Sequence, residues 1–324
     1  MRYLFLRGFV PTDRDPSQIM FDNLSECDDV WTQLFSEISK GHYGEIWYAG
    51  GKRRVKYRQD FIERWIPRLS CTKYDFRPDI IFARGGFKGY DQVMKRNKGA
   101  FKIYYGAGKR FYPVSSFKKY HLILNDTKNQ LKKTKSLFPR SNVQFMLKPA
   151  ADNIFKPVNN VKKKYDIIQV ANENKKRDIK GHAFAISHVP ENMKFIKVGI
   201  ALKKTKNKNK HIIFTNWIPR KKIPMLYSQS KVAIVCCNNV DSAPRVLVEA
   251  MACGCPVLVL DSVNFWRNKY ITEQTGKICS KKDFVASIKN MILKYNQYKS
   301  YKYYHDNLSL KCAANYIKSL VFKK

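Results

Sequence analysis

The chain has 324 residues, of which 44% are hydrophobic, and its 62 lysines and arginines against 25 acids give a formal net charge of +37. This length and apolar content suffice for two domains with hydrophobic cores. No apolar run reaches transmembrane length, and the six histidines show no metal-ligand spacing, so the sequence predicts neither a membrane span nor a metal site.

Short apolar runs separated by polar segments organise the first half of the chain. The first run contains Arg7 and is too short for a signal peptide, so we interpret it as a strand. The alternation of strands and helices predicts parallel sheets covered by helices, with ligands at the carboxyl ends of the strands. The expected elements are a helix at 30–38 and strands at 3–10, 44–51, 77–86, 101–108 and 121–126.

A segment rich in proline and asparagine, KPAADNIFKPVNN at 148–160, marks the boundary between the two halves. Prolines break regular structure here, and a run of lysines follows. We therefore predict a first domain over 1–152, a second over 153–300, and a terminal segment over 301–324 that returns to the first domain.

The second half repeats the alternation of apolar and polar segments. The expected strands end near Ala171, lie at 193–202, and occupy both ends of 211–238. The expected helices begin near Gly181, contain Leu226 and Tyr227, follow the capping pair Ser280 and Asp283, and run from about Ser309 to Phe322.

The stretch DSAPRVLVEAMACGCPVLVLD at 241–261 predicts a helix followed by a buried strand. Pro244 suits the first helical position, Ser242 can cap the helix, and Gly254 lies where the helix should end. The helix is thus expected over about Pro244–Cys253. Its N-terminus would present unpaired N–H groups and a positive dipole end, which together bind an anion such as a diphosphate.

Charged residues accompany this predicted helix. Arg245 adds a cationic donor, and Glu249 can accept two hydroxyl hydrogen bonds of the kind a ribose supplies. Asp241 and Glu249, with seven residues between them, resemble the paired acids of GT-B retaining glycosyltransferases of family 4, the glycosyl transferases group 1. The resemblance implies an α/β fold of two Rossmann-like domains facing each other across a cleft. In that family the first acid, usually Glu, reaches the donor sugar and the second holds the ribose.

The same resemblance implies further contacts with the donor. Lys180 before Gly181 matches a lysine that grips the diphosphate, and Arg177 substitutes for an arginine that relatives carry where Ala171 and Asn172 stand. The interdomain passage of the family is matched by Asp152, Phe155 and Pro157. The candidate residues are Asp241, Lys180 and Arg177 for catalysis, and Glu249, Ser242, Ala243, Pro244, Arg245, Trp217, Ile218 and Pro219 for the nucleotide.

Basic clusters interleaved with aromatic residues distinguish the first half, and this composition suits phosphates and stacked bases. It favours DNA as the acceptor, with a hydroxymethylated pyrimidine as the modified base in phage-type DNA. Two alternatives stay open: a cell-envelope glycan or lipid at an anionic membrane surface, and a non-enzymatic nucleic-acid-binding protein on a GT-B scaffold. The candidate acceptor residues are Lys52, Arg53, Arg54, Arg58, Arg84, Tyr105, Lys109 and Arg110.

We therefore expect a hexosyltransferase that moves a sugar from a nucleotide-diphosphate sugar, UDP-linked, to an anionic acceptor. Helix amides with Arg and Lys can stabilise the departing diphosphate, so no metal and no cofactor is expected. Retention of the anomeric configuration is implied by the resemblance. Eight scattered cysteines suit a cytoplasmic protein, in the host cytoplasm if it is viral. The sugar, the linkage and the oligomeric state are left open.

Overall fold

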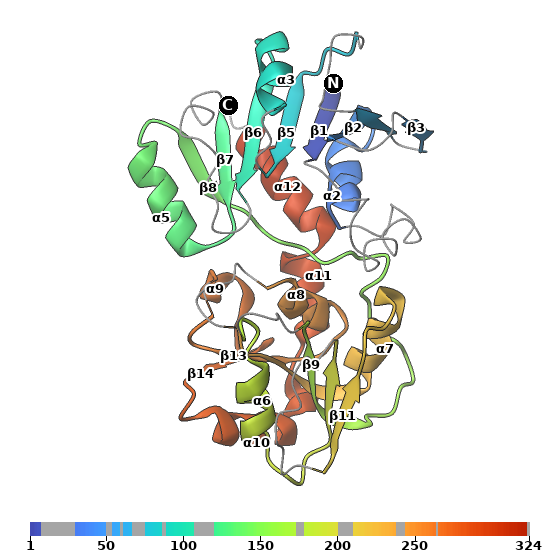
Figure 1. The fold of residues 1–324 in the computed structure, drawn as a ribbon, viewed down its shortest axis with the longest axis vertical. Coiled ribbons are helices and arrows are strands. Elements are labelled where there is room, and N and C mark those ends of the chain that lie inside the picture. The colour runs from blue at the N-terminus through green and yellow to red at the C-terminus, as the bar shows by residue number, and fades with distance from the viewer. Residues whose placement is uncertain are drawn as a thin grey trace. The chain divides into compact units, whose positions relative to one another are not determined.

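The computed structural model describes residues 1–7, 30–49, 54–58, 61–66, 75–85, 89–106, 120–172, 178–199, 210–237, 244–263 and 265–322. The chain divides into two compact units (Figure 1). Unit 1 comprises Met1–Leu147 together with Leu310–Lys324, and unit 2 comprises Lys148–Ser309. Each unit is built around its own sheet. Among the described residues, no helix combines the length and apolar character needed to cross a bilayer.

Unit 1 contains an eight-stranded sheet in the order β3-β4-β2-β1-β5-β6-β7-β8. All neighbouring strands are parallel except β3 and β4, which are antiparallel. The strands are β1 (Arg2–Arg7), β2 (Tyr43–Ala49), β3 (Arg54–Tyr57), β4 (Ile62–Ile66), β5 (Ile80–Arg84), β6 (Phe101–Gly106), β7 (Leu122–Asn125) and β8 (Asn142–Phe145). The helices are α2 (Val30–Ser39), α3 (Tyr90–Arg96), α5 (Lys128–Leu137) and α12 (Leu310–Val321).

The core of unit 1 follows from its apolar runs. Residues 3–6 of β1 are at most 2% exposed, as expected of a central parallel strand covered on both faces. Phe5 stacks on Phe35 of α2, with ring centroids 5.2 Å apart. The terminal helix α12 packs on α2, and Lys318 Nζ donates a hydrogen bond to the Glu37 carbonyl at 3.3 Å. The last helix of the chain therefore completes the core of unit 1.

Unit 2 contains a six-stranded, wholly parallel sheet in the order β11-β10-β9-β12-β13-β14. The strands are β9 (Tyr165–Val170), β10 (Phe195–Val198), β11 (Ile212–Thr215), β12 (Ser230–Val235), β13 (Val257–Leu260) and β14 (Gly276–Cys279). The helices are α6 (His182–His188), α7 (Ile223–Ser228), α8 (Arg245–Ala252), α9 (Arg267–Tyr270), α10 (Phe284–Leu293) and α11 (Ser300–Asn307), with short 3₁₀ turns η4 (Arg220–Lys222) and η5 (Tyr295–Gln297).

The expected helix in 241–261 is present and one residue shorter at each end than predicted. Pro244 is extended, with ψ 129°, and forms the N-cap, so the first helical residue is Arg245. Gly254 has φ +76° directly after the helix, which is the left-handed conformation that ends many helices. The capping pair before α10 also forms, because Ser280 Oγ accepts a hydrogen bond from the Asp283 amide at 3.2 Å and donates to its carboxylate at 2.7 Å.

Candidate functional site

A cavity of about 320 Å³ opens in unit 2 where parallel strands end. The chain passes from β9 to β10 and β11 on one side of the sheet, then returns to place β12 on the other side of β9. Ligands of open α/β sheets bind at such a reversal, outside the carboxyl ends of the strands. The described lining residues are Val170, Ala171, Asn172, Lys180, Val198, Gly199, Trp217, Ile218, Ile223, Cys237, Pro244, Arg245, Val246 and Glu249.

The N-terminal turn of α8 forms one wall of this cavity. Pro244, Arg245 and Val246 line it, and none of the side chains in the described ranges caps the helix at Pro244. Backbone N–H groups in a first helical turn have no intrahelical acceptor, and the helix dipole is positive there. This wall therefore presents donors and positive potential to an anionic ligand.

Glu249 lies just over one turn into α8 and also lines the cavity. It is only 7% exposed, and its Oε1 accepts a hydrogen bond of 2.9 Å from Arg220 Nη2. The Arg220 guanidinium lies 5.0 Å from the ring centroid of the buried Phe155. The carboxylate is therefore held in the cavity wall by a cation that is itself positioned by an aromatic ring.

The sequence analysis did not identify Arg220. It directly follows Trp217, Ile218 and Pro219, and there it looks like the start of an ordinary surface run, Arg220–Lys222. No local pattern could have found it, because its partner Glu249 lies 29 positions away in the sequence.

Lys180 lines the cavity from the loop before α6. Burial lowers the pKa of Lys180, nearby Lys148 and Arg245 lower it further, and Cys237 acts in the opposite direction. Gly181 has φ +68°, and a Cβ there would lie 2.1 Å from the Cys236 carbonyl oxygen, so only glycine fits after this lysine. The Lys-Gly pair is thus explained by close packing against the end of β12.

The α6 helix that follows is capped from within the protein. The Asp178 carboxylate accepts hydrogen bonds from the amides of His182 at 2.7 Å and Ala183 at 3.0 Å. A carboxylate at a helix N-terminus satisfies its free donors. In this part of the cavity an anion would therefore meet Lys180 rather than the amides of α6.

A buried lysine lies behind the cavity wall and binds the carbonyls of three lining residues. Lys197 is fully buried, and its Nζ donates to the carbonyls of Ala171 at 2.7 Å, Val198 at 3.3 Å and Gly199 at 3.4 Å. Gly199 has φ +109°, and a Cβ there would lie 2.4 Å from the Ala171 oxygen. The ammonium group therefore joins the ends of β9 and β10 and places positive charge beside the cavity.

The residues proposed for base contact differ in position. Trp217 is 41% exposed and lines the cavity together with Ile218. Pro219 forms the N-cap of η4 and does not line the cavity. The ring of Trp217 is therefore at the surface, where a ligand can reach it.

Residues 150–307, which contain this cavity, match the family model Glycosyl transferases group 1. No curated protein matches the chain. The group 1 match covers all the lining residues, among them six candidates from the sequence analysis: Lys180, Trp217, Ile218, Pro244, Arg245 and Glu249.

Solved glycosyltransferase structures share the fold of the whole chain. Sucrose-phosphate synthase from Thermosynechococcus elongatus has a TM-score of 0.66 at 11% identity and covers 99% of this chain and 98% of its own. The Anabaena protein Alr3699/HepE, in complex with UDP and glucose, has a TM-score of 0.68 at 10% identity, with 100% of both chains covered. A glycosyltransferase from Rickettsia africae has a TM-score of 0.65 at 14% identity and covers 99% and 98%.

These likenesses show that the chain has the α/β fold of GT-B glycosyltransferases, with two domains that each contain a parallel sheet. The fold and the group 1 match together support a glycosyltransferase. Asp241, Ser242, Ala243 and Arg177 lie outside the described residues, as do Lys52, Arg53, Lys109 and Arg110.

The described acceptor candidates lie in unit 1, before residues 150–307, which match the group 1 model. Arg54 begins β3, and Arg84 ends β5 with its guanidinium 4.4 Å from the ring centroid of Trp31. Arg58 donates to the buried Glu63 carboxylate at 2.7 Å. Tyr105 is fully buried, and its hydroxyl donates to Asp126 at 3.0 Å. Arg58 and Tyr105 thus hold buried carboxylates, a structural role that the sequence analysis did not predict.

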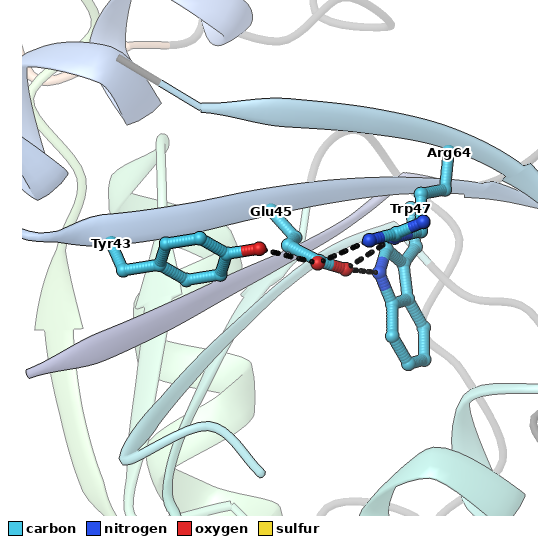
Figure 2. Close-up of polar contacts among 4 residues, drawn as sticks. All are labelled: Tyr43, Glu45, Trp47 and Arg64. Atoms are coloured by element: carbon cyan, nitrogen blue, oxygen red, sulfur yellow. Dashed lines mark hydrogen bonds and ion pairs between the residues drawn. The ribbon is translucent and has the colours of Figure 1, made fainter. Parts of the chain in front are cut away.

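A third buried carboxylate in unit 1 has its partners on strands β2 and β4. Glu45, 1% exposed, accepts hydrogen bonds from Tyr43 at 3.1 Å, from Trp47 Nε1 at 2.6 Å and from Arg64 at 2.8 Å through both Nε and Nη2 (Figure 2). Figure 2 shows the guanidinium and the indole meeting the carboxylate from one side and the phenol from the other. Four donors satisfy this group, so we assign it to the stability of the sheet.

Proposed function

We propose that this chain is a retaining, metal-independent glycosyltransferase that moves a hexose from a UDP-linked sugar to an anionic acceptor. The observation that supports it best is the cavity of about 320 Å³ in unit 2, where the N-terminal turn of α8, Arg245 and Lys180 surround one space with Glu249 in its wall. Those groups match the parts of a nucleotide-diphosphate sugar: cationic and amide donors for the diphosphate, and a carboxylate for ribose hydroxyls.

The chemistry required of such a site is stabilisation of the leaving group. As the bond between sugar and diphosphate breaks, negative charge grows on the diphosphate, and preorganised donors lower the barrier most when they point at that charge. Arg245, Lys180 and the α8 amides would act there. Asp241 would reach the sugar, and Arg177 would add a second cation, as the family resemblance implies. Retention means that the acceptor attacks from the face that the diphosphate leaves.

The acceptor we propose is DNA carrying a hydroxymethylated pyrimidine. The net charge of +37 favours a polyanion, because each neutralised phosphate releases counterions. A cytoplasmic location fits this acceptor. An anionic membrane is the competing partner. Binding of the protein to anionic vesicles but not to DNA would favour the membrane.

Calorimetry with UDP, other nucleoside diphosphates and a panel of their sugars tests the donor. We expect binding of at least one nucleotide sugar, weakened about tenfold in Glu249→Gln because one charge-assisted hydrogen bond partner is lost. Lys222→Gln, an exposed neighbour of Arg220, is the matched control and should bind like the wild type. If no nucleotide sugar binds, the non-enzymatic scaffold is the better account.

The reaction itself is tested by mass spectrometry of hydroxymethylated DNA after incubation with the donor that binds. We expect an added hexose whose anomeric configuration, read by NMR, equals that of the donor. Chelation with EDTA should leave the rate unchanged. A rate that falls with EDTA and recovers with a divalent cation would contradict the metal-independent mechanism.

A further inference from the structure

A single row of paired residues crosses the first sheet near its carboxyl edge. Residues paired across neighbouring strands project their side chains on the same face. The row therefore joins positions that are far apart in the sequence, and it consists of three arginines and three aromatic residues. In order across six strands it contains Arg54, Trp65, Tyr48, Arg7, Arg84 and Tyr105.

Arg7 and Arg84 are direct neighbours at the centre of this row. They end β1 and β5, between which the chain first forms β2, β3 and β4 on the other side of β1. The sheet order therefore reverses at this strand pair, which is where open α/β sheets bind ligands. Two positively charged side chains at paired positions on one face of the sheet repel each other, and an anion bound between them would relieve that repulsion.

Aromatic rings hold both arginines. The Arg84 guanidinium carbon lies 4.4 Å from the ring centroid of Trp31, and that of Arg7 lies 5.4 Å from the ring of Tyr48. Arg7 Nη1 also donates to Thr32 Oγ1 at 3.3 Å. Stacking engages the flat face of a guanidinium, whereas its edge carries the N–H fork that matches two phosphate oxygens. Both side chains are half-buried, so their orientation is defined before a ligand arrives.

Trp31 supplies an independent indication of a ligand at this position. The residue is 2% exposed, and within the described part of the chain its indole Nε1 has no hydrogen-bond acceptor. Its ring contacts Arg84 and lies 4.9 Å from the ring of Tyr105. Buried N–H groups are nearly always paired, so an unpaired one calls for a reason, and an acceptor oxygen on a ligand would provide it.

We propose that Arg7 and Arg84 form a phosphate subsite of unit 1 that binds a backbone phosphodiester of the DNA acceptor. The subsite rests on the proposed function for the identity of its ligand. Nucleic acid is the ligand that fits best, because guanidinium forks match phosphodiester oxygens and because aromatic side chains flank both arginines on the same face. Its role is positioning: a phosphate fixed at the strand ends sets the register of the neighbouring nucleotide.

The test is equilibrium binding of a short hydroxymethylated duplex by the full chain over a series of salt concentrations. We expect Arg7→Gln and Arg84→Gln each to weaken binding about tenfold at moderate salt and to reduce the slope of log K against log salt by about 0.9. Arg2→Gln removes the same charge from the opposite end of β1, where Arg2 is exposed. Its effects on DNA affinity and on the salt slope should be much smaller than those of Arg7→Gln and Arg84→Gln. Arg7→Lys and Arg84→Lys should keep the slope and lose part of the affinity, because the charge remains without the fork.

Several outcomes would overturn the subsite. Equal DNA affinity in Arg7→Gln, Arg84→Gln and Arg2→Gln would do so, as would wild-type protein that binds anionic vesicles and not DNA. UDP-sugar calorimetry on the same variants separates this inference from the proposed function. Normal donor binding with unchanged DNA binding in the variants overturns the subsite alone. Loss of DNA binding in the variants of a protein that binds no nucleotide sugar supports the subsite and overturns the proposed donor reaction.

Discussion

Glu249 illustrates at the scale of one residue how a binding carboxylate is prepared. Its Oε1 accepts the hydrogen bond from Arg220, and within the described ranges Oε2 is left for hydroxyl groups of a ligand. Arg220 in turn stacks on the ring of the buried Phe155. A carboxylate that is 7% exposed loses most of its hydration, and the cation offsets that loss.

We expect Arg220→Gln to raise the KM for the donor about tenfold with a smaller change in kcat, because the carboxylate loses its orientation rather than its contact with the reacting bond. A double-mutant cycle with Glu249→Gln, measured as donor affinity, should give a coupling energy of about 1–3 kcal/mol. Additive effects of the two substitutions would contradict the assignment. Lys222→Gln, an exposed lysine in the same turn, is the control.

The lowered pKa of Lys180 predicts a pH dependence of donor binding. Its pKa lies below 10.5, the ordinary value for lysine, because burial disfavours the charged ammonium form. Diphosphate binding needs the charged form, so donor affinity should fall as pH rises through the lowered pKa. Calorimetry at a series of alkaline pH values measures this, and Lys180→Gln should bind weakly at all of them.

Stability in the absence of donor should respond to the same group with the opposite sign. Between the lowered pKa of folded Lys180 and the unfolded value of 10.5, the unfolded chain binds one more proton than the folded chain. The free energy of unfolding contributed by this group therefore rises with pH across that window. Cys237 also lines the cavity, and burial raises the pKa of its thiol. The variant Cys237→Ser removes the contribution of this thiol to the pH dependence of the free energy of unfolding.

At the scale of elements, β4 shows how charged residues can form an interior strand. Glu63 and Arg64 are consecutive, so their side chains lie on opposite faces of the sheet. Glu63 accepts hydrogen bonds from Arg58 at 2.7 Å and from Tyr48 at 2.6 Å, and Arg64 pairs with Glu45. Each face of the β2–β4 pair is thus held by a buried carboxylate and an arginine.

We expect Arg64→Met to lower the free energy of unfolding by about 3–5 kcal/mol, because it leaves the Glu45 carboxylate buried without its cation. The double variant Arg64→Met with Glu45→Gln should regain part of that loss. Arg77→Met removes an arginine whose exposed pair with Asp75 spans 3.5 Å, and it should cost less than about 1 kcal/mol. Urea denaturation measures all three, and equal losses for Arg64→Met and Arg77→Met would refute the argument.

At the scale of the whole molecule, the net charge of +37 sets the physics of any partner. Proteins that neutralise several phosphates lose DNA affinity linearly in a plot of log K against log salt, with about 0.9 per phosphate. We expect such a line for a duplex and only weak retention on phosphatidylserine vesicles at about 0.15 M salt, where screening acts over roughly 8 Å. Strong vesicle binding with no DNA binding at that salt would favour an envelope acceptor.

Local sequence patterns predicted the apolar strands of the sheets and did not predict the charged ones. The apolar runs predicted β1, β2, β5, β6 and β7, and the capping pattern of Ser280 and Asp283 predicted the start of α10. The strands β3 and β4 were not predicted. Their charged residues interrupt the regular spacing of apolar residues that marks a strand. Pairing with distant residues such as Glu45 offsets the desolvation of those charges when they are buried.

From sequence alone follow the α/β class, the helix that carries Glu249, the glycine after Lys180 and the family resemblance, because these depend on backbone preferences and burial periods within a few neighbouring residues. The tertiary structure alone decided that Arg220 pairs with Glu249 across 29 positions, that Tyr105 is buried, and that Arg7 stands beside Arg84. Those contacts depend on the order of strands in each sheet, which brings together residues that no local spacing relates.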